Sequence, residues 1–284
     1  MTASPADKAF PEPAEITDDE LAEIATILSM WRGTNMSAYK DTCMKRRVAI
    51  RMRSSGSRDA AGYCTLLRQN PQELDLLQKT LTIHVSQFFR NPSMFDTLRD
   101  TVLPGLFSSC EESGAGKLRL WCLGCAGGEE PFSLAILLRE HFSREMRTVP
   151  TTIVGTDIDA ETIRAARQGE YIEDRLKEVP AGLKQRYFRK SGSRFCLVTG
   201  LREMVTFQQG DITRTAEYLP SDLVVCRNTL IYFTRPDQEK ILHGIADILP
   251  AGGILVLGRS EELTGDVRQR FEALCPVERI YRRL

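Results

Sequence analysis

The chain has 284 residues, of which 42% are hydrophobic, so it can bury one large core or two smaller ones. Its 38 basic and 38 acidic residues cancel, and net charge alone therefore does not indicate a polyanionic partner. No apolar run reaches the ~18 residues of a membrane span, and no signal peptide is recognisable, so we expect a cytoplasmic protein without membrane insertion.

The first third of the chain predicts a tail followed only by helices. Residues 1–15 are rich in Ala and Pro, which is typical of a disordered tail. A Thr-Asp-Asp-Glu capping box at 17–20 precedes apolar residues at helical spacing. Asn-Pro pairs at 70–71 and 91–92 each place a polar cap before a proline at the first helical position. We predict an all-helical N-terminal domain over residues 16–107.

Residues 40–58 are strongly basic, with seven basic residues against one acid. In a helical arrangement, a basic stripe lies beside an apolar one. The basic stripe consists of Lys40, Arg47 and Arg51, and the apolar stripe of Met44, Val48 and Met52. We interpret this segment as a helix that packs through its apolar stripe and docks an acidic partner through its basic stripe, with a solvated basic face as the alternative.

The small, polar segment 108–117 predicts a linker, because the chain then changes to short apolar runs alternating with helical patterns. This alternation predicts an α/β domain over 118–284, with an open, mostly parallel sheet and helices on both faces. Residues of about 185–204 predict a small antiparallel β-subdomain within it. The predicted strands are 118–123, 152–156, 205–208, 223–226 and 254–257, and the predicted helices are 131–141, 160–168 and 235–249.

The first strand-to-helix turn, GCAGG at 124–128, allows a ligand to approach the backbone closely. The next strand ends at Asp157, whose carboxylate can accept hydrogen bonds from ribose hydroxyls. Glu129 and Glu130 follow the turn and would repel a pyrophosphate, but they tolerate a sulfonium cofactor without phosphates. The pattern favours S-adenosylmethionine (SAM) over a nicotinamide dinucleotide, with a purely structural turn as the alternative.

Eight cysteines are scattered along the chain, which favours reduced thiols over a disulfide framework. Cys122 and Cys125 form a CxxC, but three histidines and no second CxxC do not complete a zinc site. We therefore expect no metal, and the sequence leaves open whether this pair has a redox role.

Five segments occur in a characteristic order. They are TIHVSQFFRNPSMF (82–95), GCAGGEEPFSLAI (124–136), VGTDID (154–159), VVCRNTLIYF (224–233) and GGILVLGRSE (252–261). Over residues of about 20–284 the chain thereby resembles the chemotaxis receptor methyltransferase (CheR) family. The resemblance implies a Rossmann-like SAM-dependent protein-glutamate O-methyltransferase, which methylates glutamates of methyl-accepting chemotaxis receptors and releases S-adenosylhomocysteine.

The resemblance also implies residue roles. Arg90 would lie near the cofactor carboxylate and the active site. Our candidates for the catalytic residues that orient the acceptor carboxylate are Arg90 and Tyr232, although Tyr232, which the resemblance does not assign, could equally be a core aromatic. Because a glutamate is already ionised at neutral pH, no general base is required. The implied cofactor-binding residues are His84, Ser86, Arg90, Gly124, Glu130, Asp157, Asp211, Ile212, Cys226, Arg227 and Asn228. His84 and Ser86 depart from the asparagine and threonine usual in the family, which weakens these two assignments.

The acceptor in the resembling family is a long cytoplasmic helical bundle with acidic methylation sites, which suits docking to Lys40, Arg47 and Arg51. We expect a monomer. The short loop 190–194 favours an enzyme that does not need a receptor's C-terminal peptide tether. The sequence does not identify the receptor or the methylated glutamates.

Two other function classes would fit parts of this sequence. A nucleic-acid methyltransferase would place the basic helix on phosphates, but residues 227–232 lack the Asn/Asp-Pro-Pro-aromatic motif of amino-directed base methyltransferases. A non-enzymatic SAM or partner sensor would lose site residues, whereas Arg90, Glu130, Asp157 and Asn228 are all present. We therefore expect no nucleic-acid substrate.

Overall fold

A computed structural model of the chain describes residues 16–32, 36–81, 86–114 and 116–284, which divide into two compact units, Met1–Ile83 and His84–Leu284. This division corrects the boundary predicted at 108–117. Most of the predicted linker belongs to helix α6 (Leu103–Ser113). The apolar residues of α6 pack into the core of the second unit, and the small polar residues that suggested a linker lie on its exposed face. The predicted tail, residues 1–15, lies outside the described residues.

The described part of the first unit is helical. Its helices are α1 (Asp18–Arg32), α2 (Asp41–Ser55), α3 (Ala60–Gln69) and α4 (Pro71–Leu81). The capping box is confirmed, because the Thr17 amide donates to Glu20 Oε2 at 2.8 Å and the Glu20 amide donates to Thr17 Oγ1 at 3.3 Å. The Asn70 side chain caps α4 by accepting from two backbone amides. The predicted apolar stripe of α2 is buried in this unit's core.

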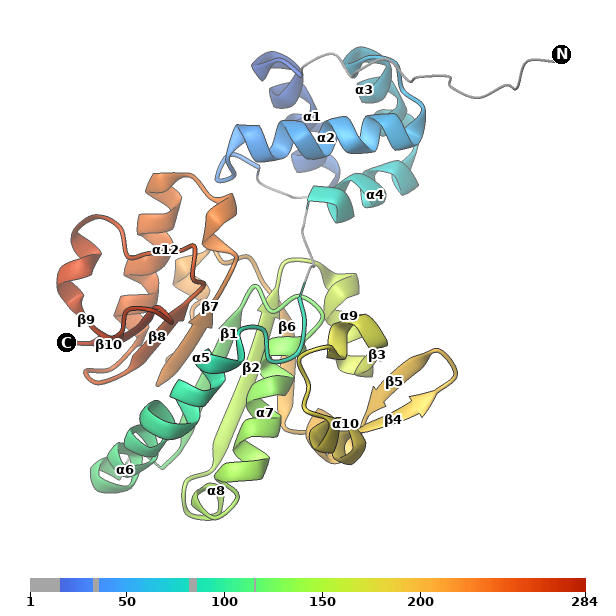
Figure 1. Cartoon of the computed structure of the whole chain (residues 1–284). Coiled ribbons are helices and arrows are strands. Elements are labelled where there is room, and N and C mark those ends of the chain that lie inside the picture. The colour runs from blue at the N-terminus through green and yellow to red at the C-terminus, as the bar shows by residue number, and fades with distance from the viewer. Residues whose placement is uncertain (1–15, 33–35, 82–85, 115) are drawn as a thin grey trace, which may run out of the picture. The chain divides into compact units, whose positions relative to one another are not determined.

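In residues 116–284, seven strands form one sheet in the order β6-β2-β1-β7-β8-β10-β9 (Figure 1). The strands are β1 (Leu118–Leu123), β2 (Thr151–Asp157), β6 (Val205–Gln209), β7 (Leu223–Cys226), β8 (Ile254–Leu257), β9 (Phe271–Cys275) and β10 (Ile280–Arg283). The first five in spatial order are parallel, and β10 is antiparallel to both of its neighbours. Every residue of β7 and β8 is buried, as expected for central parallel strands.

All five predicted strands are confirmed, and so are the helices between them. The helices are α7 (Glu129–His141), α9 (Ala160–Gln168) and α12 (Arg235–Ile248). Before β1 in the chain come α5 (Pro92–Thr97), a π-helical turn at Leu98–Val102 and α6. A short helix, α8 (Glu145–Thr148), follows α7. None of the helices in the described residues is both long and apolar enough to cross a lipid bilayer.

A second, antiparallel sheet in the same unit has the order β3-β5-β4 and lies apart from the large sheet (Figure 1). Its strands are β3 (Glu170–Ile172), β4 (Phe188–Ser191) and β5 (Arg194–Leu197), and short helices α10 (Ala181–Tyr187) and α11 (Thr199–Arg202) flank the hairpin. The β4–β5 hairpin confirms the predicted β-subdomain. Phe88 packs edge-to-face against Tyr171 and Phe188, which joins this sheet to the segment that carries Arg90.

Candidate active site

The carboxyl ends of the parallel strands place most of the predicted site residues along one edge of the sheet. Leu123 of β1 is in register with Thr156 of β2, and Cys226 of β7 is in register with Leu257 of β8. Ligands of open α/β sheets bind beyond this edge. The predicted residues at or just after these strand ends are Gly124, Asp157, Asp211, Ile212, Cys226, Arg227 and Asn228.

The glycine turn after β1 brings two loops close together. Gly124 has a φ of 68°, and a Cβ at this position would lie 2.4 Å from Oγ1 of Thr229, in the loop after β7. Gly128 has a φ of 85° and immediately precedes α7. Glycine is required at both positions, because other residues adopt this backbone conformation at a cost and a side chain at Gly124 would displace the loop.

Asp157 at the tip of β2 is buried and fixes the glycine turn. Its Oδ2 accepts a hydrogen bond from the Ala126 amide at 2.9 Å, and its Oδ1 accepts from the Asp159 amide at 3.1 Å. The N-cap of α9 is Asp159. Through these two bonds the carboxylate ties the glycine turn after β1 to the start of the loop that follows β2.

Glu130 and Arg227 form a buried ion pair between α7 and the loop after β7. Arg227 Nη1 lies 2.9 Å from Glu130 Oε2, and the Arg227 side chain is only 2% exposed. Burial raises the pKa of Glu130, and the charges of Arg227 and, more weakly, Arg90 oppose this shift. The guanidinium of Arg227 points toward protein groups, because it donates to Glu130, to the Arg90 carbonyl and to Asn91.

Glu261 is a site residue that the sequence analysis missed. Its carboxylate, in a residue that is 4% exposed, accepts from the backbone amides of Asn228, Thr229, Leu230 and Gly258 at 2.7–2.8 Å. These bonds order the loop in which Asn228 has a φ of 55°. The only signal was its place at the end of the GGILVLGRSE motif, because a carboxylate that binds backbone amides leaves no pattern of partner residues in the sequence.

The segment before α5 carries Arg90 and is held from several sides. The Phe88 amide donates to the Arg175 carbonyl at 3.0 Å, and the Arg175 guanidinium donates to the Ser86 carbonyl. The Phe89 amide donates to Ser133 Oγ of α7 at 2.9 Å. Arg90 is half-buried. The predicted contact of His84 lies outside the described residues.

The remaining predicted residues are placed as follows. Asp211 Oδ1 accepts from the Thr213 amide at 2.9 Å and from its hydroxyl at 2.8 Å, which forms a turn after β6. Ile212 and Cys226 are buried. Tyr232 is half-buried and ends a 3₁₀ turn at Leu230–Tyr232. Their roles in ligand binding stay predictions.

In the structure of α2, two residues of the predicted docking stripe bind groups of α4, which corrects that prediction. Arg47 Nη1 donates to the carbonyls of Thr80 and Leu81 at 2.9 Å and thereby caps the C-terminal end of α4. Arg51 forms two bonds with Glu73, at 2.6 and 2.7 Å. Arg47 and Arg51 reach α4 because they lie next to the apolar stripe that α2 buries. Lys40, just before α2, is exposed.

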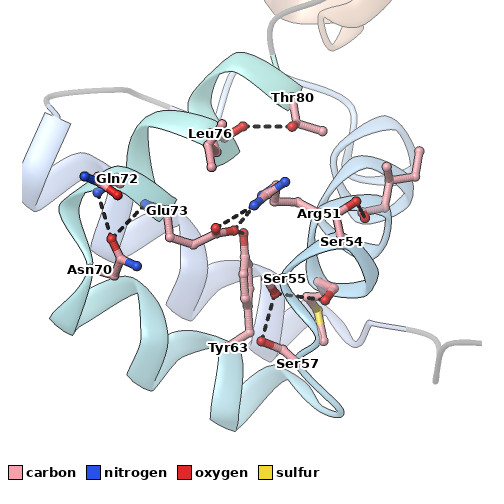
Figure 2. A network of polar contacts seen from close by, with 12 residues as sticks. Arg51, Ser54, Ser55, Ser57, Tyr63, Asn70, Gln72, Glu73, Leu76 and Thr80 are labelled. Carbon is pink, nitrogen blue, oxygen red and sulfur yellow. Dashed lines mark hydrogen bonds and ion pairs between the residues drawn. The ribbon is translucent and has the colours of Figure 1, made fainter.

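Figure 2 shows Arg51 and Tyr63 converging on the Glu73 carboxylate. The Tyr63 hydroxyl donates to Glu73 Oε1 at 3.0 Å, and both Tyr63 and Glu73 are buried. Burial, reinforced by the negative charge of Glu73, raises the pKa of Tyr63. This network crosslinks α2, α3 and α4, so Arg51 has a structural role in the first unit.

The CxxC cysteines are buried thiols. Burial raises the pKa of Cys122 and of Cys125 well above the ordinary value, which keeps both protonated and unreactive. All eight cysteines are free. Among the described residues, no group of three or more His, Cys, Asp or Glu side chains is arranged to hold a metal ion.

Comparison with known proteins gives two family matches that together span both units. The model described as "CheR methyltransferase, SAM binding domain" matches residues 84–278, and that described as "CheR methyltransferase, all-alpha domain" matches residues 19–82. These limits agree with the division at Ile83 and His84.

Three relatives illustrate the similarity. An uncharacterized 104.1 kDa protein of Rhodobacter capsulatus is 33% identical over 96% of this chain, which spans 28% of that protein. A chemotaxis protein methyltransferase of Listeria innocua is 32% identical over 81% of this chain and 85% of its own length. A chemotaxis protein methyltransferase of Borreliella burgdorferi is 30% identical over 88% of this chain and 90% of its own length.

Proposed function

Because the chain belongs to the CheR methyltransferase family, we propose that it transfers the methyl group of SAM to glutamate side chains of methyl-accepting chemotaxis receptors. The observation that supports this most directly is the convergence of the Gly124 turn, Asp157 and the Glu130–Arg227 pair at the carboxyl edge of the parallel strands. This edge is where an open α/β sheet binds a nucleoside cofactor.

The residues at this edge fit SAM. We assign to Asp157 the hydrogen bonds from the ribose hydroxyls, and the positive φ angles of Gly124 and Gly128 allow a ligand close to the backbone. We assign Glu130 to the cofactor's ammonium group and Arg90 to its carboxylate, as membership of the family implies. The opposite charges match the two ends of an amino-acid moiety and do not match a pyrophosphate.

When bound, SAM supplies an electrophilic methyl group on a sulfonium. A receptor glutamate, ionised at neutral pH, donates an oxygen electron pair to the methyl carbon, and the carbon–sulfur bond electrons remain on sulfur. The chain's residues need only hold the carboxylate in line, about 3 to 3.5 Å from the methyl carbon, and partly remove its water. We assign this orientation to Arg90 and to the hydroxyl of Tyr232.

We further propose that the exposed face of α2 docks the receptor's cytoplasmic helical bundle. Arg46 and Arg53 are exposed, and Ile50 between them is 40% exposed. Their spacing of four and three residues places all three on one side of the helix. A basic face with one apolar residue complements a bundle with acidic methylation sites. Arg46 and Arg53, together with Lys40, thus replace Arg47 and Arg51 in the docking proposal.

Calorimetry with SAM and with S-adenosylhomocysteine tests the cofactor assignment, with Asp157→Ala as the matched variant. We expect both ligands to bind the wild-type protein. A folded wild-type protein that binds neither ligand would overturn the proposed function. Transfer of label from SAM to nucleic acid, with a steep salt dependence, would favour the nucleic-acid methyltransferase instead.

A further inference from the structure

The turn that carries Arg90 has an unusual backbone. Phe89 and Asn91, on either side of Arg90, have φ angles of 53° and 63°. Residues with side chains rarely adopt this left-handed region, and for a bulky residue it is a genuine outlier. Asn91 also precedes Pro92, and the proline ring restricts the residue before it. Other parts of the unit must therefore hold this turn in place.

Ser133 of α7 holds the turn at Phe89. It is fully buried, its Oγ accepts from the Phe89 amide at 2.9 Å, and its hydroxyl donates to the Glu129 carbonyl at 2.6 Å. The Phe89 ring is buried and packs against Phe95, with ring centroids 5.1 Å apart. The serine belongs to the motif at residues 124–136, and the proposed cofactor contacts do not account for it.

Arg227 holds the other side of the turn. Its Nη2 donates to the Arg90 carbonyl at 3.1 Å and to Asn91 Oδ1 at 2.6 Å, while Nη1 binds Glu130. The sequence predicts Asn91 as an N-cap of α5, but its side chain makes no capping bond with that helix. The asparagine oxygen is instead an acceptor for Arg227.

We propose that Ser133 and Arg227 are positioning residues for methyl transfer, which together clamp the turn 89–91 and fix the direction in which the Arg90 side chain leaves the backbone. The clamp joins the start of α7 and the end of β7 to the Arg90 turn. This inference rests on the proposed function, because it assigns a purpose to Arg90 only if Arg90 orients the acceptor or the cofactor.

The test is a double-mutant cycle between Ser133→Ala and Arg90→Lys, assayed by transfer of label from SAM to a cytoplasmic receptor fragment. Ser133→Ala removes one hydroxyl and leaves the Phe89 amide without its acceptor. We expect kcat/KM to fall roughly 10- to 100-fold, because a misplacement of about 1 Å can cost about 100-fold. In the Arg90→Lys background the same change should have less than about a two-fold effect, because it acts through Arg90.

Equal effects of Ser133→Ala in both backgrounds would overturn the inference, since a serine that merely stabilises the fold acts independently of Arg90. So would wild-type turnover of Ser133→Ala. If Arg90→Lys has no measurable turnover, the same cycle is measured on SAM affinity by calorimetry. Circular dichroism must show that each variant is folded. Absence of methylation by the wild-type protein would instead contradict the proposed function.

A second pair of variants tests the left-handed backbone conformation of residue 91 separately from its side-chain bond to Arg227. Asn91→Gly and Asn91→Ala both remove the bond to Arg227, but only glycine adopts a φ near 63° without strain. We expect Asn91→Gly to retain several-fold more turnover than Asn91→Ala. Equal turnover of the two variants would show that the left-handed conformation does not position Arg90.

Discussion

Helix α2 and the loop after β7 each carry an arginine whose sequence context indicated ligand contact, and in each case the guanidinium binds a buried or nearly buried glutamate. Arg51 of α2 pairs with Glu73, and Arg227 pairs with Glu130. Their surroundings differ. The first pair crosslinks helices with Tyr63, whereas the second also contacts the backbone of Arg90. The same kind of ion pair therefore stabilises the fold in one unit and supports a candidate site in the other.

The largest expected effect concerns the pair in the first unit. Arg51→Ala leaves the buried Glu73 carboxylate without its cation, and breaking a buried pair costs about 3 to 5 kcal/mol. Denaturant unfolding should show this loss, whereas Arg46→Ala, an exposed change on the same helix, should stay within about 0.5 kcal/mol of wild type. Similar stabilities of the two variants would remove the distinction between the inward and outward arginines of α2.

Arg90→Lys tests the second region. Lysine keeps the charge but cannot form two parallel hydrogen bonds, so we expect the variant to fold and to lose roughly 100-fold or more of receptor methylation, or about 3 kcal/mol of transition-state stabilisation. Arg164→Lys, an exposed change on α9, is the matched control. Near-wild-type turnover of Arg90→Lys would make Arg90 a structural residue like Arg51.

Asp157→Ala should weaken SAM binding by about 1.5 to 3 kcal/mol, because it removes charged hydrogen bonds to the ribose. Since Asp157 also holds the Ala126 amide, Asp157→Asn is the informative companion, which keeps one acceptor oxygen. Calorimetry should place its affinity between those of the wild type and Asp157→Ala. Unchanged affinity in both variants would mean that this carboxylate only shapes the glycine turn.

The smallest effect is expected at the surface of α2. Arg46→Glu combined with Arg53→Glu should slow receptor methylation several-fold at low salt and leave SAM affinity unchanged. The difference should shrink at physiological salt, where exposed charges are screened beyond about 8 Å. Arg164→Glu controls for a charge reversal elsewhere. If methylation is unaffected even at low salt, the basic face of α2 is only solvated, and recognition lies elsewhere in the chain.

The sequence predicted the elements better than the side-chain partners. Short runs with apolar residues, alternating with helical patterns, identified β1, β2, β6, β7 and β8, whereas the partly exposed strands β9 and β10 were not predicted. The strand-end residues followed from the strands. The direction of Arg47 and Arg51 could not be predicted, because their acceptors lie on α4 and depend on how the helices pack.

The contacts that hold the backbone of the candidate site likewise could not be predicted from the sequence. Asn91 before Pro92 has the pattern of a helix cap, yet tertiary contact with Arg227 takes its side-chain oxygen. Glu261 binds amides from two loops that meet only when β7 and β8 pair. Such contacts are set by the packing of distant segments and not by local composition.

The central claim is that the strand-end residues support methylation of receptor glutamates. Incubating the wild-type protein with SAM labelled in its methyl group and a cytoplasmic receptor fragment tests it most directly. We predict label in the receptor fragment that is released by mild base, as expected of a glutamate methyl ester, and little label with Arg90→Lys. Label that resists base, or that enters nucleic acid instead of the receptor fragment, would contradict the account.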